Sequence, residues 1–382
     1  MKTYLMFDDD AGSESPAELY AEALVAASAG ALEIDVRRPG RLNETIAVIK
    51  QLAPQGLLLD VALTNALDDQ QQPVGFDGIA LAQQVRTLQT RARSPNSAEN
   101  LPEFPVIRLS KRDVVREYVN KDSTSDDLFD EHIDKEVVLD DPDCAARIAV
   151  ALATDYPAII GFANVEPEDA ALAKLLGCEG SLLSRLDPRV LLGLRRPGTP
   201  AHVLARFVVV ELLGRAGPLV NAELLAVRLG VDTTVSGDWP KLAVLLETSR
   251  YSGLFAGGYA RWWMASTLDW WQREIDEDKT PARLSAVERV NLIKAATKLE
   301  RLTAIEGTED SPGTRFWHRC ASSGRPVDAA EGFPLLPVYG METWHDTEYL
   351  CLEEALRNPR HNRLALSEQA RVQALIRKRE SS

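Results

Sequence analysis

Cysteine is scarce in this chain, and long apolar runs are missing. The 382 residues include only four cysteines, which are too few and too scattered for a disulfide framework and agree with a reducing compartment. The longest apolar run, near Ala205–Leu213, is interrupted by Arg206 and Glu211 and stays well below the roughly 18 residues that a membrane helix needs. The first residues, MKTYLMFDDD, lack the apolar core of a signal peptide. We therefore expect a cytoplasmic protein.

Negative charge is concentrated in the N-terminal part of the chain. The net charge is −14 at pH 7, and residues 1–156 carry 28 acidic and 15 basic side chains, which leaves −1 for the remainder. Such an acidic region repels nucleic-acid phosphates and is compatible with a cation site. The apolar fraction of 45% is typical of a globular protein, and the length suffices for two or three domains.

Residues 1–156 alternate short apolar runs with segments of helical periodicity, which predicts βα units around a parallel sheet. The predicted strands are 4–7, 32–36, 56–60, 104–109 and 132–135. The predicted helices include 16–29, 43–52 with Asn43 as its cap, 76–87 and 141–153. This order is typical of a flavodoxin-like doubly wound α/β fold. Residues 91–100 are rich in Ser, Asn and Pro and are predicted to form a flexible insertion.

Polar residues follow the ends of four predicted strands, at the edge where a doubly wound sheet binds its ligands. They are Asp8 and Asp9, Asp60, Ser110, and Lys135. Carboxylates are suitable ligands for Mg²⁺, and an aspartate can attack phosphorus to form an acyl phosphate. A lysine and a hydroxyl can bind the remaining phosphoryl oxygens.

Five sequence pieces, in their order along the chain, resemble the receiver (CheY-like) family of two-component response regulators. These pieces are FDDD, LLLD, FDGIALAQQVR, PVIRLS and HIDK, and the resemblance covers residues 1–156. It implies a Mg²⁺ site formed by Asp8, Asp9, Asp60 and the backbone carbonyl of Ala62. It also implies that Asp60 accepts a phosphoryl group, with Ser110 as the switch hydroxyl and Lys135 as the phosphate-binding lysine. The implied partner is a histidine kinase or phosphotransfer protein.

The sequence departs from the family pattern at several positions. Residues 61–75 are longer than the usual loop before the Asp-Gly pair, here Asp77 and Gly78. Lys111 replaces a small residue, Glu136 replaces a proline, and His132 takes the place of the aromatic switch residue. A pseudo-receiver scaffold that is not phosphorylated therefore remains an alternative.

The chain after residue 156 is predicted to be mainly helical, in two regions, 157–280 and 281–382. Residues 201–263 have the order of elements of a winged helix, a module that DNA-binding response regulators join to a receiver. However, residues 201–274 hold seven basic and seven acidic side chains, and the candidate reading helix offers only Lys241. Nucleic-acid binding is thus disfavoured, and protein contacts are the preferred role. A DNA-binding transcriptional regulator is the alternative.

Two further groups in this part of the sequence have a structural and a functional interpretation. Trp262, Trp263, Trp270 and Trp271 recur at near-helical spacing and favour core packing over a ligand cage. His318, Cys320, His345 and Cys351 contain the ligand types of a zinc site, but their spacing matches no familiar finger. Buried thiols and ordinary histidines are the preferred interpretation, with zinc left open.

The combined prediction is a two-component phosphorelay protein in which phosphorylation of Asp60 regulates protein contacts of the C-terminal region. The sequence has no Gly-rich phosphate loop and no recognisable Ser-His-Asp arrangement, so an enzymatic output is unsupported. Unusual receiver fusions occur in phage-defence cassettes, which suggests an antiviral relay by analogy alone. The kinase, the output partner, the stimulus and the oligomeric state are left open.

Overall fold

The computed structural model describes two compact units. Unit 1 comprises residues 1–214 together with 252–259, and unit 2 comprises 215–251 together with 260–382. The described residues are 1–12, 14–68, 71–91, 100–111, 127–163, 168–196, 198–308, 313–338 and 340–380. Most of the predicted insertion at 91–100 lies outside them.

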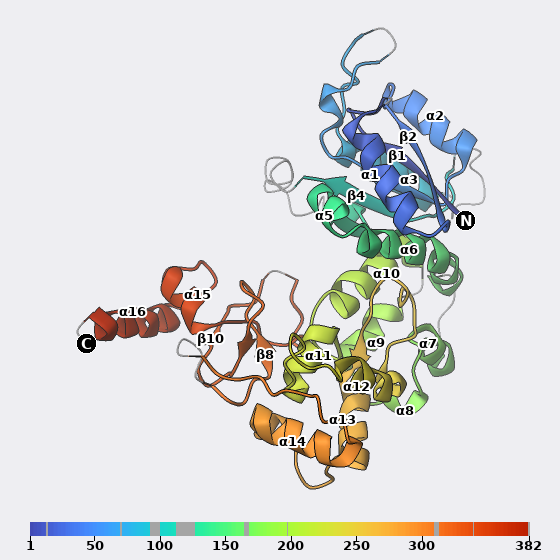
Figure 1. Cartoon of the computed structure of the whole chain (residues 1–382). Helices are drawn as coiled ribbons and strands as arrows, with labels where there is room; N and C mark the ends of the chain where they lie inside the picture. The colour runs from blue at the N-terminus through green and yellow to red at the C-terminus, as the bar shows by residue number, and fades with distance from the viewer. Residues whose placement is uncertain are drawn as a thin grey trace. The chain divides into compact units, whose positions relative to one another are not determined.

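A five-stranded parallel sheet forms the centre of unit 1 (Figure 1). Its strands are β1 (Lys2–Phe7), β2 (Leu32–Arg37), β3 (Gly56–Leu59), β4 (Val106–Ser110) and β5 (Glu131–Asp134). They follow the order β2-β1-β3-β4-β5, and every neighbouring pair is parallel. This is the strand order of flavodoxin-like doubly wound sheets, so the predicted fold class is confirmed. The buried strand β3 is a continuous apolar run, as expected for a strand covered on both faces.

Helices flank this sheet and begin at short polar caps. They are α1 (Pro16–Ala27), α2 (Leu42–Leu52), α3 (Gly78–Arg91), α5 (Lys135–Asp140) and α6 (Pro142–Ala163). The Ser15 hydroxyl accepts the Glu18 N–H at 3.3 Å at the start of α1. The cap predicted at Asn43 is wrong, because α2 begins one residue earlier and the Glu44 carboxylate accepts the N–H of the cap residue Arg41 at 2.9 Å.

Helix α6 continues through the predicted domain boundary after residue 156. It has 22 residues with Pro157 in its interior, and it packs on α1 and α10. Among the described residues it is the one helix long and apolar enough to pass a membrane-span test, and half of the tested window is buried within the protein. The predicted division into three domains remains a prediction.

Unit 1 also contains short helical elements beyond α6. They are α7 (Asp169–Leu175), α8 (Gly180–Leu183), α9 (Pro188–Leu194), α10 (Ala201–Arg206) and the π-helical turn η3 (Phe207–Leu213). The segment 252–259 joins this unit through hydrogen bonds. The Phe255 N–H donates to the Asp155 carboxylate at 2.6 Å, and the Leu254 N–H donates to the carbonyl of Leu175 at 2.9 Å.

Unit 2 is built from helices and very short strands. Its first elements are β6 (Leu219–Val220), α11 (Ala222–Leu229), α12 (Trp239–Leu245), η4 (Glu247–Ser249), β7 (Trp262–Trp263), α13 (Met264–Glu274), η5 (Pro281–Arg283) and α14 (Ala286–Thr297). They are followed by β8 (His318–Arg319), β9 (Pro326–Val327), β10 (Phe333–Pro334), β11 (Tyr349–Leu350), α15 (Leu352–Arg357) and α16 (Leu366–Glu380). The four tryptophans predicted as core, Trp262, Trp263, Trp270 and Trp271, are all buried.

A buried ion pair ties α3 to the start of β5. The Arg86 guanidinium donates to the Asp130 carboxylate at 2.6 Å, and both side chains are almost fully buried. The Asp130 carboxylate also accepts the Val106 N–H at 2.7 Å and the Tyr156 hydroxyl at 3.1 Å. Burial raises the pKa of Asp130, and the charge of Arg86 opposes this shift. Because each group satisfies the other, removal of one leaves an uncompensated buried charge.

We predict that Asp130→Asn destabilises unit 1 by about 3–5 kcal/mol. The matched control is Asp127→Asn, because Asp127 is exposed and pairs with Arg206 at 2.9 Å, and its loss should cost less than about 1 kcal/mol. Urea unfolding of the full chain, followed by circular dichroism, measures both effects. Equal losses in the two variants would contradict a special role for the buried pair.

Candidate functional site

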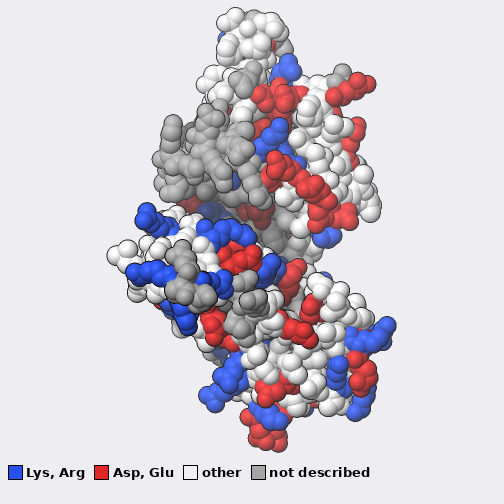
Figure 2. All heavy atoms as spheres, turned by 60° about the vertical axis from the view of Figure 1, so that its left-hand side comes forward, with Lys and Arg blue, Asp and Glu red and all other residues white. Residues whose placement is uncertain are grey.

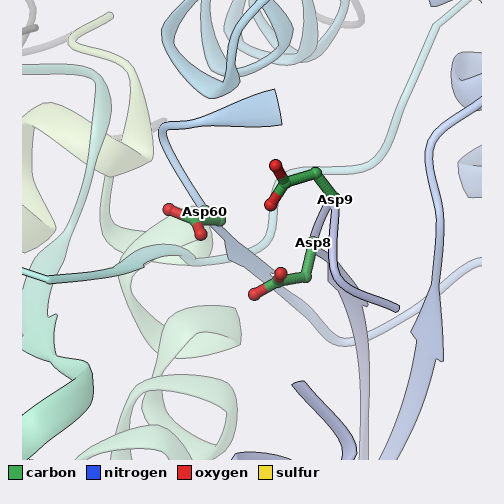
Figure 3. Close-up of side chains that lie close together, drawn as sticks. All are labelled: Asp8, Asp9 and Asp60. Carbon is green, nitrogen blue, oxygen red and sulfur yellow. The ribbon is translucent and has the colours of Figure 1, made fainter. Parts of the chain in front are cut away.

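Three carboxylates meet at the carboxyl edge of the sheet. Asp8 and Asp9 follow β1 and Asp60 follows β3, and these two strands are paired with Phe7 opposite Leu59. Each residue offers a carboxylate oxygen, and these oxygens lie within 4.8 Å of one another. Figure 3 shows the three side chains gathered around a common space. The structure thus brings together the three acids that the sequence analysis selected.

Ser110, at the end of β4, is hydrogen-bonded to Asp60. Its hydroxyl donates to Asp60 Oδ1 at 2.7 Å and accepts the Val61 N–H at 2.9 Å. The Ala62 N–H also donates to Asp60 Oδ1, at 3.3 Å. The orientation of the Asp60 carboxylate is therefore fixed by a neighbouring strand and by its own loop.

The Lys135 ammonium lies between two of the carboxylates. Its Nζ donates to Asp8 Oδ2 at 2.7 Å and also to Asp60 Oδ2. Burial works to lower the pKa of Lys135, but the charges and hydrogen bonds of Asp60 and Asp8 outweigh it, so the pKa is raised. The lysine is therefore a fixed positive charge beside Asp60, a suitable place to receive an anionic oxygen.

Gly78, the first residue of α3, packs directly against the backbone of this site. A Cβ atom at Gly78 would overlap the carbonyl oxygen of Asp60. The Gly78 N–H donates to the carbonyl of Val61 at 2.9 Å, and Asp77 caps the helix by accepting the Ala80 N–H at 2.7 Å. The sequence signal for this contact is the Asp77-Gly78 pair, which is needed because only glycine permits so close an approach.

The donor set at this edge fits a hard divalent cation. Carboxylate oxygens are the ligands that Mg²⁺ prefers, and it is usually held by one or two carboxylates while it keeps several waters. Asp8 and Asp60 are buried, and Asp9 is partly exposed, so the group has access to solvent on one side. Among the described residues, no other group of three or more His, Cys, Asp or Glu side chains is close enough to share an ion.

The predicted zinc candidates do not form such a group in the part of the chain that the structure describes. Cys320 and Cys351 are buried beside each other, with the Cys351 N–H donating to Cys320 Sγ at 3.3 Å. His318 instead stacks on Tyr349, with ring centroids 4.5 Å apart, and the His345 ring lies against Trp344. The zinc interpretation is therefore not supported.

His132 lies on β5, opposite Arg108 of β4 in the strand register. Its ring centroid is 5.8 Å from that of Phe129. Burial, together with the charges of Arg108 and Arg206, lowers the pKa of His132 to about 3. The imidazole is therefore neutral near pH 7, in the position where the family pattern has an uncharged aromatic ring.

We predict that His132 makes unit 1 less stable as the pH falls. Its folded pKa is depressed, so between pH 6.5 and about 3 the unfolded chain binds a proton that the folded chain does not. Between pH 7 and pH 5 the wild type should lose about 2 kcal/mol more than His132→Phe. Urea unfolding at both pH values measures this difference, with His361→Phe in unit 2 as control. Parallel losses in wild type and His132→Phe would contradict the prediction.

A contact that the sequence analysis missed links β5 to the segment 252–259 within unit 1. The Tyr259 hydroxyl donates to the Glu131 carboxylate. Burial raises the pKa of Glu131, and this hydrogen bond and that from the His132 N–H oppose the shift. The two residues are 128 positions apart in sequence, and no local pattern signals their pairing.

Comparison with known proteins gives similarity to receiver domains over the N-terminal part of the chain. No family model and no curated protein matches this sequence. A CheY-like receiver domain from Methylobacillus flagellatus is 14% identical, with 35% of this chain and 86% of that chain covered and a TM-score of 0.23. A LuxR-family DNA-binding response regulator from Staphylococcus aureus is 16% identical, with 36% of this chain and 88% of that chain covered and a TM-score of 0.23. The signal receiver domain of a modulated diguanylate cyclase from Desulfovibrio desulfuricans G20 is 17% identical, with 40% of this chain and 97% of that chain covered and a TM-score of 0.25.

The fold assignment rests on the strand order and strand directions, which are those of a flavodoxin-like doubly wound sheet. The segment between β4 and β5, residues 112–126, lies outside the described residues.

Proposed function

We propose that this chain is a two-component signalling protein whose receiver accepts a phosphoryl group on Asp60. One observation carries the proposal. The Asp60 carboxylate lies between the Ser110 hydroxyl and the Lys135 ammonium, beside two further carboxylates. Phosphoryl transfer to aspartate requires a nucleophile, a hydroxyl, a fixed cation and an acidic group that binds a metal ion.

In the proposed reaction, an Asp60 carboxylate oxygen attacks phosphorus and the bond from phosphorus to the donor breaks. The donor is a phosphohistidine of a histidine kinase or phosphotransfer protein, or a small acyl phosphate. Lys135 stabilises the negative charge on one phosphoryl oxygen, and the Ser110 hydroxyl turns from Asp60 to donate to another. Transfer therefore exchanges the Ser110–Asp60 hydrogen bond for a bond to the phosphoryl group.

Asp8, Asp9 and Asp60, with the backbone carbonyl of Ala62, would hold Mg²⁺ in this site. When bound, the ion neutralises charge on the transferring phosphoryl group. The Lys135 ammonium offsets the negative charges of the Asp8 and Asp60 carboxylates, which explains why these acids can be buried.

We predict that acetyl phosphate with Mg²⁺ adds one phosphoryl group to the wild type and none to Asp60→Asn. The amide cannot form the acyl phosphate, so the adduct should fall to background in intact-mass spectrometry. The matched control is Asp35→Asn, the same change at an exposed acid on β2 that pairs with Arg37. A folded wild type that acquires no adduct from acetyl phosphate or from a phosphotransfer protein would favour the pseudo-receiver scaffold.

The output is proposed to run through β5 and the later residues of unit 1. Three contacts join the receiver to those residues: Glu103 accepts the Ala201 N–H at 2.9 Å, Asp127 pairs with Arg206 at 2.9 Å, and Glu131 accepts the Tyr259 hydroxyl. Ser110 is opposite Asp134 in the β4–β5 register, so a shift of Ser110 acts directly on the strand that carries Glu131. Phosphorylation would thus alter the surface that residues 201–207 and 252–259 present to a protein partner.

We predict that Tyr259→Phe uncouples the segment 252–259 from phosphorylation. Loss of the hydroxyl leaves the partly buried Glu131 carboxylate with one fewer donor, a change worth about 1 kcal/mol. The acetyl phosphate adduct on Asp60 should persist, while the phosphorylation-dependent change in hydrogen exchange at 252–259 disappears. Tyr349→Phe in unit 2 is the control. An unchanged exchange response in Tyr259→Phe would exclude this route.

Transcriptional regulation is the second candidate, because α11, α12 and the β6–β7 pair follow the order of a winged helix. Two cations of this region are paired with acids: Lys241 with Asp238 at 3.1 Å and Arg250 with Glu247 at 3.4 Å. Basic side chains are more frequent on α16, which carries Arg371, Arg377, Lys378 and Arg379. Figure 2 shows Lys and Arg side chains gathered on one face of the molecule. Salt-sensitive binding of the full chain to a genomic DNA pool in an electrophoretic shift assay would favour this candidate. The phage-defence context remains a prediction by analogy.

A further inference from the structure

Two of the four cysteines lie side by side in the C-terminal part of unit 2. Cys320 follows β8 and Cys351 precedes α15, and each residue is only 3% exposed. Cys320 Sγ accepts the Cys351 N–H at 3.3 Å, although the residues are 31 positions apart. Cys351 Sγ also lies 3.7 Å from the Ser323 hydroxyl. The two thiols therefore share one small polar environment inside an otherwise apolar cluster.

Several contacts hold the turn after Cys320 against the start of α15. The Ala321 N–H donates to the carbonyl of Tyr349 at 2.8 Å. The Ser322 hydroxyl donates to the Glu354 carboxylate at 2.9 Å, and Arg325 pairs with Glu353. These contacts already close the loop between the two cysteines, so a covalent link between the sulfurs would add little further ordering cost.

The two thiols differ in their acidity. The hydrogen bond from the Cys351 thiol lowers the pKa of Cys320, and the same bond raises the pKa of Cys351. Cys320 is therefore the residue of the pair that more readily becomes a thiolate, and the Cys351 thiol stabilises that thiolate by its hydrogen bond. A thiolate beside a thiol is the arrangement in which an oxidised sulfur is resolved into a disulfide.

We propose that Cys320 and Cys351 form a reversible redox pair that closes as a disulfide under peroxide. This is a modification site separate from the phosphoacceptor, and it does not depend on the proposed function. The Cys320 thiolate attacks one oxygen of hydrogen peroxide, which yields a sulfenic acid and releases hydroxide. The Cys351 thiol then attacks the Cys320 sulfur, the S–S bond forms, and water leaves with the thiol proton. Two thiols lose two electrons, and one peroxide becomes two waters overall.

The disulfide would join the β8–β9 hairpin to α15. Strands β8, β9, β10 and β11 have only two residues each, and this part of unit 2 has a small apolar core of its own. Small cores gain most from a covalent link. Oxidation should therefore raise the melting temperature of unit 2 by roughly 5–10 °C, and reduction should reverse the shift.

The test treats the full chain with hydrogen peroxide, then alkylates it in denaturant and maps the peptides by mass spectrometry. The expected result is a linked peptide pair containing Cys320 and Cys351, a loss of two hydrogens from the intact mass, and full reversal by dithiothreitol. Cys144 and Cys178 are the internal controls: they are partly exposed, so they test whether exposure alone drives oxidation, and neither should appear in a linked peptide.

Two results would overturn the proposal. One is peroxide oxidation that stops at Cys144 or Cys178 and leaves Cys320 and Cys351 as thiols. The other is zinc released from the freshly purified protein on thiol modification, since metal-bound sulfurs would not be a redox pair. The variants Cys320→Ala and Cys351→Ala keep a small apolar side chain and should each abolish the linked peptide. Because the primary readout uses the wild type, misfolding of a variant does not decide the outcome.

Discussion

The edge of the sheet in unit 1 depends on one ammonium group. Two like charges 4 Å apart repel by about 4 kcal/mol at an effective dielectric constant near 20, so buried carboxylates do not gather without a cation. Lys135 supplies that cation from the end of β5 to acids that follow β1 and β3. The same interaction therefore links the ends of three strands and sets the electrostatics of the candidate site. A sheet of this order without the lysine would have to hold these acids apart or protonated.

Much of unit 1 could be predicted from the sequence because its signals are local. Apolar runs such as Gly56–Leu59 are followed by an acid, and parallel strands place their carboxyl ends at one edge of the sheet. The order of the elements therefore predicts that Asp8, Asp60, Ser110 and Lys135 lie close together. Contacts between distant polar residues carry no such signal. The Arg86–Asp130 pair and the Tyr259–Glu131 bond join residues whose neighbours in sequence say nothing of their partners.

Local signals also misled in particular places. Asn43 is a good cap residue, yet it lies inside α2, because the reciprocal half of a capping box, formed by Glu44 and the Arg41 N–H, starts the helix earlier. The helix predicted over 141–153 continues through Pro157 to residue 163, since its packing on α1 and α10 outweighs the one hydrogen bond that proline removes. For the His and Cys residues of unit 2 the sequence favoured buried thiols and left zinc open. Cys320 and Cys351 are buried, and their positions depend on hairpins too short to read from sequence.

Unit 1 is not one continuous stretch of the chain, because residues 252–259 complete it after 37 residues of unit 2 have intervened. During synthesis the ribosome must deliver the chain to Tyr259 before Glu131 and Asp155 meet their partners. The strands of the parallel sheet all precede this point in the chain, but the last contacts of unit 1 form only when residues 252–259 have been synthesised. A gene cut after residue 214 would therefore encode an incomplete unit 1, and a ribosome stalled between these positions would carry unit 1 without the segment 252–259.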